Sequence, residues 1–146
     1  VLLCGKNLKE TVLKPIMQPS VINGKIVEVK KPLETVIDFL GTTSSAKDEI
    51  AALLGDRTAF STPKPMKLIK EFVRAASEKD SIVLDFFAGS GTTGHAVMDL
   101  NKEDGGSRKF ILITNDENNI CKNITVPRIR KAIDFFNYKE TFDFLA

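Results

Sequence analysis

Residues 85–94, DFFAGSGTTG, combine a carboxylate with three closely spaced glycines. Gly89, Gly91 and Gly94 complete a G-x-G-x-x-G pattern, which lets the chain turn sharply and lets a ligand approach the backbone. Where such a loop joins a strand to a helix, backbone N–H groups and the positive end of the helix point at the ligand. The segment therefore predicts a site for a nucleotide-like ligand.

Asp85 narrows the choice of ligand. A carboxylate within about 4 Å of a dinucleotide pyrophosphate would cost roughly 1 to 4 kcal/mol in repulsion. S-adenosylmethionine has no phosphate, and its ammonium and sulfonium groups suit a carboxylate, while the loop amides suit its own carboxylate. A phosphate-binding P-loop is excluded because Thr92 follows Gly91 where a lysine is needed. The alternative is that Asp85 caps the loop or pairs with a lysine.

The loop needs a strand before it and a helix after it. Residues 81–87 form a short apolar run that predicts a strand buried on both faces, and 109–114 predict a second such strand. Between them, 92–102 predict a helix with Val97 and Leu100 inward. This βαβ pattern predicts a parallel sheet and an α/β, Rossmann-like fold.

Two more helices are predicted ahead of the first strand. Ser45 is predicted to cap a helix that Gly55 closes. A second helix is predicted from Pro65 onward. Its apolar positions recur at helical spacing and are Met66, Ile69, Phe72, Val73 and Ala76.

The two ends of the chain are less informative. Residues 19–30 predict a hairpin, because Asn23-Gly24 separates β-branched residues. We interpret residues 1–38 as an N-terminal segment that could end a target-recognition region, and 39–146 as the ligand-binding domain portion. After the second strand, helix is predicted in two pieces around Pro127, with Ile129, Ile133 and Phe136 on one face.

A second polar group follows the second predicted strand. In Rossmann proteins an acidic residue at this place binds the ribose hydroxyls. Asp116, within Thr114-Asn115-Asp116-Glu117, is our candidate. The alternative is that this polar run only starts the next helix, since acidic residues favour helix N-termini.

Composition excludes several other classes. With 42% hydrophobic and 27% charged residues the chain has the makeup of a soluble domain, predicted to be cytoplasmic and without a membrane partner. Cys4 and Cys121 lie far apart with no partner at metal spacing, so no metal site is predicted. The net charge of +2 decides nothing about nucleic acid. The chain starts at Val1 rather than Met, which we interpret as a piece of a longer protein.

Three stretches together resemble a known family. VLDFFAGSGTTGHAV resembles the S-adenosylmethionine motif of bacterial amino-methylating DNA methyltransferases, and FSTPKPMKLIKEFV resembles the Pro-Lys-Pro motif of their permuted (beta-class) members. RKFILITNDENNICKNITVPRIRKAI is most similar to modification subunits of type III restriction-modification systems, which methylate adenine N6. The resemblance runs from about Phe39 to Ile133.

The resemblance implies a cofactor site in two segments. The residues around the methionine half of S-adenosylmethionine would be Asp85, Phe86, Phe87, Gly89, Ser90, Gly91 and Thr93. Beside it would run Phe60, Ser61, Thr62, Pro63 and Lys64. One of Phe86 and Phe87 would lie against the adenine, and the alternative for both is core packing. In the family the acidic residue directly follows the second strand, whereas here Thr114 holds that position and Asp116 comes later.

The catalytic motif of that family is absent from this sequence. It places two prolines and an aromatic next to a polar residue, which hold the amino group of a flipped base. The chain has no Pro-Pro pair, so we expect the cofactor-binding half of the enzyme, inactive alone, with no catalytic residue of its own. DNA, a restriction subunit and a second copy of the chain are the predicted partners. Cytosine N4 as target, a non-catalytic remnant and a nicotinamide-dependent enzyme stay open.

Other polar residues have a functional and a structural interpretation. His95 is either packed in the helix after the loop or a base, and packing is favoured. The basic residues either contact phosphates or lie on solvated helix faces, which is favoured. They are Lys67, Lys70, Arg74, Arg128, Arg130 and Lys131.

Overall fold

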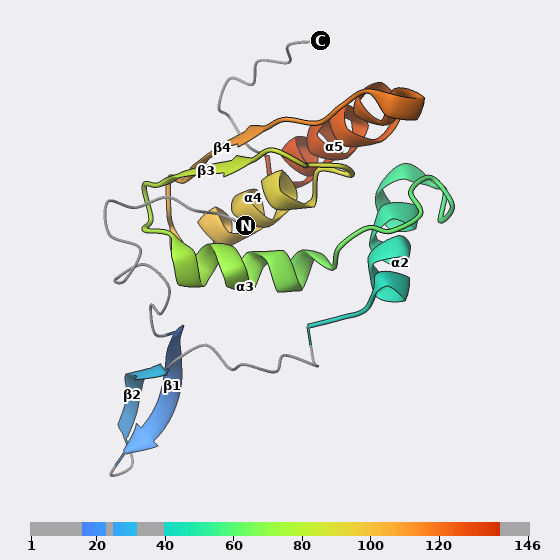
Figure 1. The fold of residues 1–146 in the computed structure, drawn as a ribbon. Coiled ribbons are helices and arrows are strands. Elements are labelled where there is room, and N and C mark those ends of the chain that lie inside the picture. The colour runs from blue at the N-terminus through green and yellow to red at the C-terminus, as the bar shows by residue number, and fades with distance from the viewer. Residues whose placement is uncertain (1–15, 23–24, 32–39, 138–146) are drawn as a thin grey trace.

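The computed structural model describes residues 16–22, 25–31 and 40–137 (Figure 1). It is a mixed α/β fold with one parallel and one antiparallel strand pair. In chain order the elements are β1 (Ile16–Ile22), β2 (Lys25–Lys31), α2 (Thr43–Leu54), α3 (Met66–Ala76), β3 (Ile82–Asp85), α4 (Thr92–Asp104), β4 (Lys109–Leu112), the 3-10 turn η1 (Glu117–Asn119), the π-helical turn η2 (Cys121–Thr125) and α5 (Val126–Phe136).

β3 and β4 are parallel neighbours joined by α4, which confirms the predicted βαβ unit. Val83 pairs with Phe110 in the ladder. Beyond the last paired residues the contact continues, because the Ile113 N–H donates to the Asp85 carbonyl at 2.8 Å and the Ala88 N–H donates to the Ile113 carbonyl at 3.1 Å. The start of the glycine loop is therefore tied to the end of β4.

Helices α3, α4 and α5 cover one face of this strand pair (Figure 1). Val83 packs with Val73 of α3 and with Val97 and Leu100 of α4, and Phe110 lies against the same cluster. Val97 and Leu100 are fully buried, as predicted. A second cluster joins α4 and α5 to β4, and its members are Met98, Ile129, Ala132, Phe110, Leu112, Ile133 and Phe136.

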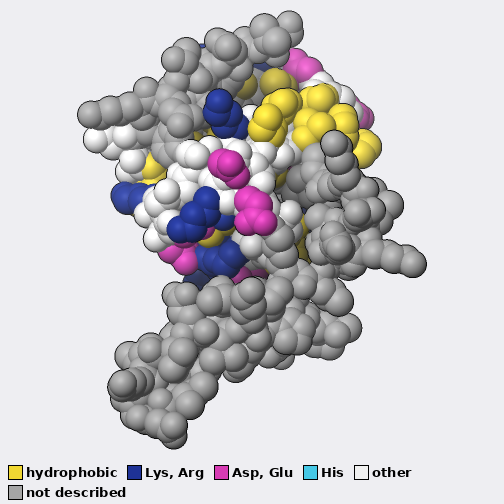
Figure 2. All heavy atoms as spheres, turned by 90° about the vertical axis from the view of Figure 1, so that its left-hand side faces the viewer, with side chains coloured by type: hydrophobic (Ala, Val, Ile, Leu, Met, Phe, Trp, Pro, Cys, Tyr) yellow, Lys and Arg dark blue, Asp and Glu magenta, His cyan; other side chains and the backbone are white. Residues whose placement is uncertain are grey.

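The other face of the pair is open in the part of the chain that the structure describes. Ile82, Ile111 and Ile113 are exposed by 48–56%, so the prediction of strands buried on both faces is wrong here. The buried clusters that join α3, α4 and α5 to the strands contain Val83, Phe110 and Leu112, which alternate with these. Figure 2 shows hydrophobic side chains gathered on one part of the molecular face that it draws.

α2 begins three residues earlier than predicted. Thr42, not Ser45, is the N-cap: its Oγ1 accepts from the Ser45 N–H at 3.2 Å, and Ser45 Oγ accepts from the Thr42 N–H at 2.8 Å. Both residue types cap helices, and this reciprocal arrangement is a capping box. Gly55 ends the helix with a φ of 84°, as predicted.

α3 follows Pro65 as predicted, but its basic residues do not form a solvated face. Lys70 contacts Asp99 at 2.6 Å and Glu103 at 3.0 Å, both on α4. Burial lowers the pKa of Lys70, but the hydrogen bonds to these carboxylates outweigh it and raise the pKa above its ordinary value. Arg74 pairs with Glu71 and Glu103. The pairs with Asp99 and Glu103 hold α3 against α4, whereas Lys67 is exposed as predicted.

The segment after β4 reaches α5 through two irregular turns. Asn118 and Asn119, both within η1, have positive φ. In η2 the Val126 N–H bonds to the Cys121 carbonyl, five residues back. The change to α-helix thus occurs at Val126, and Pro127 sits in the first turn of α5, where its missing N–H costs nothing.

The predicted hairpin is present. β1 and β2 pair antiparallel in a register that sets Ile22 opposite Lys25, while Asn23-Gly24 lies outside the described residues. No helix among the described residues is both long and apolar enough to cross a membrane.

Candidate functional site

The loop between β3 and α4 needs its first two glycines. Gly89 has a φ of 49° and Gly91 a φ of 75°, in the left-handed region where a side chain is strained. A Cβ on Gly89 would also lie 3.2 Å from the ring of Phe60. Gly91 is the N-cap of α4, so the loop delivers its backbone to the start of a helix. N–H groups in that first turn lack partners within the helix.

The third glycine of the pattern has a different role. Gly94 lies inside α4 with ordinary φ, and a Cβ there would stand 2.8 Å from Ile129 Cδ1 and 3.0 Å from the side chains of Leu112 and Phe110. Gly94 therefore permits close packing of α4 on β4 and α5, rather than approach of a ligand.

Asp85 ends β3 and reaches across the loop. One carboxylate oxygen accepts the Phe87 N–H at 3.0 Å, and the other accepts the Thr93 hydroxyl at 2.5 Å. The capping alternative is thus part of its role, because these bonds close the loop from residue 85 to 93. A carboxylate offers about four acceptor positions, so two remain for another donor.

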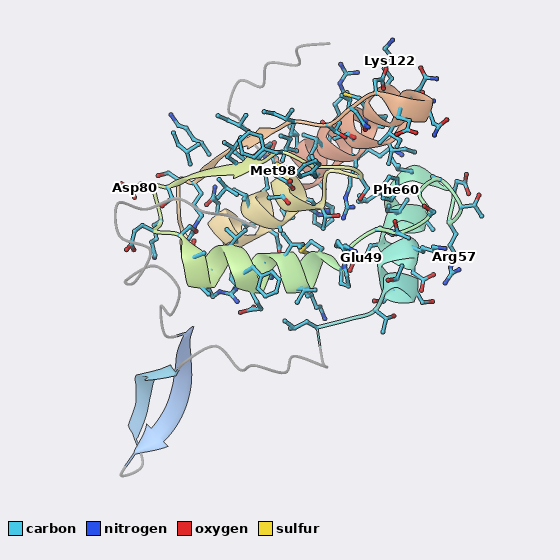
Figure 3. All side chains as sticks on the ribbon, in the orientation of Figure 1. Glu49, Arg57, Phe60, Asp80, Met98 and Lys122 are labelled. Atoms are coloured by element: carbon cyan, nitrogen blue, oxygen red, sulfur yellow. The ribbon has the colours of Figure 1, made fainter. Side chains whose placement is uncertain are left out.

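Part of the Pro-Lys-Pro segment lies against the same loop. Phe60 touches the Gly89 position, and the Lys64 carbonyl accepts from Thr92 Oγ1 at 3.4 Å. Figure 3 labels Phe60 between α2 and the loop that follows β3. Pro63 is fully buried. The side chains of Ser61, Thr62 and Lys64 are exposed, so this segment presents polar groups to solvent beside the loop.

Two phenylalanines follow Asp85 directly. Phe86 is 59% exposed and Phe87 is 92% exposed. The core-packing alternative is therefore wrong for both in the described part of the chain. An almost fully exposed Phe next to a carboxylate and a glycine loop is available for stacking on a flat apolar ring.

Asp116 lies in a different setting at the end of the neighbouring strand. It is exposed, accepts from the Cys121 N–H at 3.0 Å, and has Lys122 Nζ at 3.9 Å. These bonds start the turns that lead to α5, as the helix-start alternative supposed. The contacts leave one side of the carboxylate in solvent.

The interpretation of Arg128 as part of a solvated face is wrong. Its side chain on α5 is completely buried, and Nη1 donates to Ser90 Oγ at 3.1 Å and to Thr92 Oγ1 at 2.8 Å. Nη2 lies 3.8 Å from Glu49 of α2, on the side of that helix that faces the start of α3 (Figure 3). Burial lowers the pKa of Arg128 to about 10, against the pull of Glu49, so the guanidinium stays charged at neutral pH.

Other residues near Arg128 were also missed from the sequence. Thr125 Oγ1 donates to the Gly89 carbonyl at 2.5 Å, and Ile129 packs where a Cβ of Gly91 would be. One sequence signal existed: Ile124, Arg128 and Ala132 fall four residues apart and are all buried, so Arg128 lies within an apolar stripe. Arg130 and Lys131 are exposed, and Lys131 Nζ donates to the Leu53 carbonyl at 2.5 Å.

His95 is packed in α4, as favoured. Its ring lies 5.6 Å from that of Phe136, and its Nδ1 is buried without a hydrogen-bond partner among the described residues. The pKa of His95 is lowered to about 4, mainly by burial and also by the charge of Arg128, while Asp99 opposes both effects. The imidazole is therefore neutral at physiological pH.

Comparison with known proteins decides the family. A family model described as DNA methylase (N6_N4_Mtase) matches residues 6–126. The chain belongs to the N6/N4 DNA methylase family. The family prediction is thereby confirmed, and membership argues against the nicotinamide-dependent alternative. The match begins well before Phe39, where the resemblance in sequence motifs began.

This member of the family is similar to parts of longer curated proteins. Over 87 residues it is 52% identical to the Mod subunit of the type III restriction-modification enzyme StyLTI of Salmonella typhimurium, covering 60% of this chain and 13% of that relative. It is 53% identical over 76 residues to the EcoPI Mod subunit of Escherichia phage P1, covering 52% and 12%. The type II methyltransferase M.KpnI of Klebsiella pneumoniae is 45% identical over 74 residues, covering 51% and 18%.

The chain therefore spans less than a fifth of the length of these three relatives. Its described residues contain no group of three or more His, Cys, Asp or Glu side chains that could hold a metal ion. The candidate site of this chain thus consists of the loop after β3, the segment around Phe60 and the end of β4.

Proposed function

We propose that this chain is the cofactor-binding part of a site-specific DNA methyltransferase that transfers a methyl group from S-adenosylmethionine to adenine N6, as in a type III modification subunit. Residues 39–146 would form a partial Rossmann-like methyltransferase domain, and residues 1–38 would end a target-recognition region. The observation that carries the proposal is the Asp85 carboxylate, which closes the glycine loop at the carboxyl end of β3. A pyrophosphate would meet repulsion there.

The residues present fit the two ends of this cofactor. Asp85 keeps acceptor positions for an ammonium, and the loop at Gly89 and Gly91 brings the start of α4 close to a carboxylate. Phe60 lies against the Gly89 position and the ring of Phe87 is exposed, so we assign these rings to contact with the adenine, and Asp116 would accept from the ribose hydroxyls. Ser61, Thr62, Pro63 and Lys64 would line the segment beside it.

The bound cofactor would supply an electrophilic methyl group on sulfur. The residues of this chain would hold it in position, so that an amino nitrogen of a flipped base can approach in line. The chain itself has no Pro-Pro-aromatic motif, and we assign base binding and methyl transfer to the whole enzyme, acting on DNA together with a restriction subunit.

Calorimetric titration of the chain tests cofactor binding. We expect S-adenosylmethionine and S-adenosylhomocysteine to bind and NAD not to bind. Asp85→Ala should weaken binding of both by about tenfold or more, because a charged hydrogen-bond acceptor is lost. The matched control is Asp48→Ala, an exposed aspartate on α2 that contacts Arg57. Binding of NAD, or equal affinities for wild type and Asp85→Ala, would contradict the assignment.

The target base needs a second measurement. Cells that express the chain within its complete coding sequence should contain N6-methyladenine in plasmid DNA, measured by mass spectrometry of nucleosides. N4-methylcytosine in its place would keep the cofactor site and replace the target. A chain expressed alone is expected to produce neither base.

A further inference from the structure

We propose that Arg128 is a positioning residue for the glycine loop: it fixes the loop through Ser90 and Thr92 and sets a permanent positive charge beside it that favours the anionic end of the ligand. The ligand part of this inference rests on the proposed function. The geometric part, that α5 holds the loop in shape, stands on contacts within the chain.

Burying the Arg128 guanidinium at this position costs free energy. The side chain is completely buried, and its nearest carboxylate, that of Glu49, is 3.8 Å away. Nε and Nη2 are buried without a hydrogen-bond partner among the described residues. Burying an incompletely paired charge is unfavourable, and an apolar side chain of similar volume often replaces one without loss of stability. The free energy of burial alone therefore does not account for an arginine at this position.

Arg128 Nη1 contacts the glycine loop directly. It donates to two hydroxyl oxygens of one loop, at 3.1 Å on Ser90 and 2.8 Å on Thr92. Because a guanidinium only donates, both oxygens must accept from it and their hydrogens are directed elsewhere. Thr92 Oγ1 donates to the Lys64 carbonyl at 3.4 Å, and Ser90 Oγ lies 3.2 Å from Thr92 Oγ1. Arg128 thus orders a chain of hydroxyls from the loop to the Pro-Lys-Pro segment.

Arg128 also links elements that are distant in sequence. Glu49 of α2, which faces Nη2, also accepts the Met66 N–H at the start of α3 at 3.1 Å. Thr125, on the turn before α5, donates to the Gly89 carbonyl. α2, the start of α3, the loop and α5 therefore meet through one buried side chain and its neighbours.

Charges of opposite sign are bonded to the two parts of the glycine loop. The loop is bonded to a carboxylate through Thr93 and to a guanidinium through Ser90 and Thr92. A zwitterionic amino acid carries an ammonium and a carboxylate, which complement these two charges. The two groups are about as far apart as neighbouring residues of the loop. In a buried setting such fixed charges act with little screening. Arg128 would thus contribute to binding the amino acid end of the ligand without touching it.

The test compares Arg128→Met, Arg128→Lys and the matched control Arg130→Met, which changes an exposed arginine on the same helix. Two readouts are needed on the whole chain: hydrogen exchange of amides 89–93 without ligand, and affinity for two ligands. S-adenosylhomocysteine carries the amino acid end, and 5′-methylthioadenosine lacks it.

We expect Arg128→Met to speed exchange in 89–93 and to weaken S-adenosylhomocysteine by about tenfold or more, while 5′-methylthioadenosine changes by less than about threefold. Arg128→Lys should recover part of the difference, because the charge is retained, and Arg130→Met should match wild type. If Arg128→Met does not fold, Ser90→Ala, which removes one acceptor, should show the same ligand preference to a smaller degree.

Unchanged exchange and unchanged affinity in Arg128→Met would overturn the inference. Equal loss for both ligands would also overturn it, since a general loss of structure would not distinguish them. If the wild-type chain binds neither ligand, the proposed function fails for this chain, and exchange in 89–93 alone decides whether Arg128 positions the loop.

Discussion

The carboxyl ends of β3 and β4 lie side by side but are built differently. From Ala88 onward the residues after β3 are mostly buried, with two glycines at positive φ, and they bond to α5 and to the Pro-Lys-Pro segment. The residues after β4 are exposed, and Asp116 bonds only within the turn it begins, among the contacts described. We infer that the first end is set in shape before a ligand arrives and that the second adjusts to it.

This difference separates two kinds of polar group. Asp85 is held from two sides, so its remaining acceptor positions have a fixed direction. Asp116 has solvent around part of its carboxylate, where a hydrogen bond to a ligand replaces one to water and contributes less. Position at the end of a parallel strand is thus not enough to predict how strongly a residue contributes.

The largest expected effect comes from filling the space at Gly94. Gly94→Val adds three carbons where a single Cβ already meets Ile129, Leu112 and Phe110 at 2.8–3.0 Å. We expect a loss of about 3 kcal/mol in the free energy of unfolding, measured in urea. Asn118→Gly at the other strand end, exposed and at positive φ, should change stability by less than about 0.5 kcal/mol. Equal effects at the two ends would remove the contrast between them.

The next largest effect is a pH dependence of stability that arises from His95, in the helix that follows the loop after β3. The pKa of His95 is lowered to about 4 by burial, then by Arg128, so the unfolded chain binds more protons than the folded chain between about pH 6.5 and 4. Stability should therefore fall as pH falls through this window, by at most about 3 kcal/mol from this group. His95→Gln should show a correspondingly smaller fall in urea titrations at pH 7 and pH 4. Identical pH profiles would show that His95 does not titrate in this way.

Ligand affinity compares the two acidic residues directly. Asp85→Asn should weaken S-adenosylhomocysteine by about tenfold or more, because in the proposed site the lost charge would face the ligand's ammonium. Asp116→Asn should weaken it by about fivefold or less, as expected for a partly solvated hydrogen bond to a hydroxyl. The measurement is calorimetric titration of both variants under one set of conditions. A larger effect at Asp116 would reverse our ranking of the two strand ends.

The smallest effect concerns two ion pairs, one between α3 and α4 and one in the turns after β4. Lys70 and Asp99 are largely buried and 2.6 Å apart, whereas Lys122 and Asp116 are more exposed and 3.9 Å apart. Double-mutant cycles with Lys→Met and Asp→Asn should give a coupling of about 1 kcal/mol for the first pair and close to zero for the second. Couplings of equal size would mean that the Lys70–Asp99 pair adds no more to stability than the exposed pair.

Local patterns predicted much of this arrangement. The glycine loop, α4 with its inward Val97 and Leu100, and the end of α2 at Gly55 follow from signals within a few residues. The start of α2 was misplaced because Thr42 and Ser45 are both good caps, and only their mutual hydrogen bonds distinguish them.

The errors concern contacts between distant segments. Arg128 was placed in solvent, but its partner Ser90 lies 38 residues earlier, and no local pattern pairs them. The strands were predicted to be buried on both faces because Ile111 and Ile113 alternate with equally apolar neighbours. Which face is covered depends on packed elements, and a periodicity of two cannot decide this when both faces are hydrophobic.

The π-helical turn ahead of α5 has a consequence for insertions and deletions. Adding or removing one residue there would rotate every following side chain by roughly 100° about the helix axis. Arg128 and Ile129 would then leave the glycine loop together, although no residue of the site had been replaced. The number of residues from Cys121 to Thr125 is accordingly as much a requirement as their identity, whereas the exposed stretch around Asn118 can change in length with little effect on the loop.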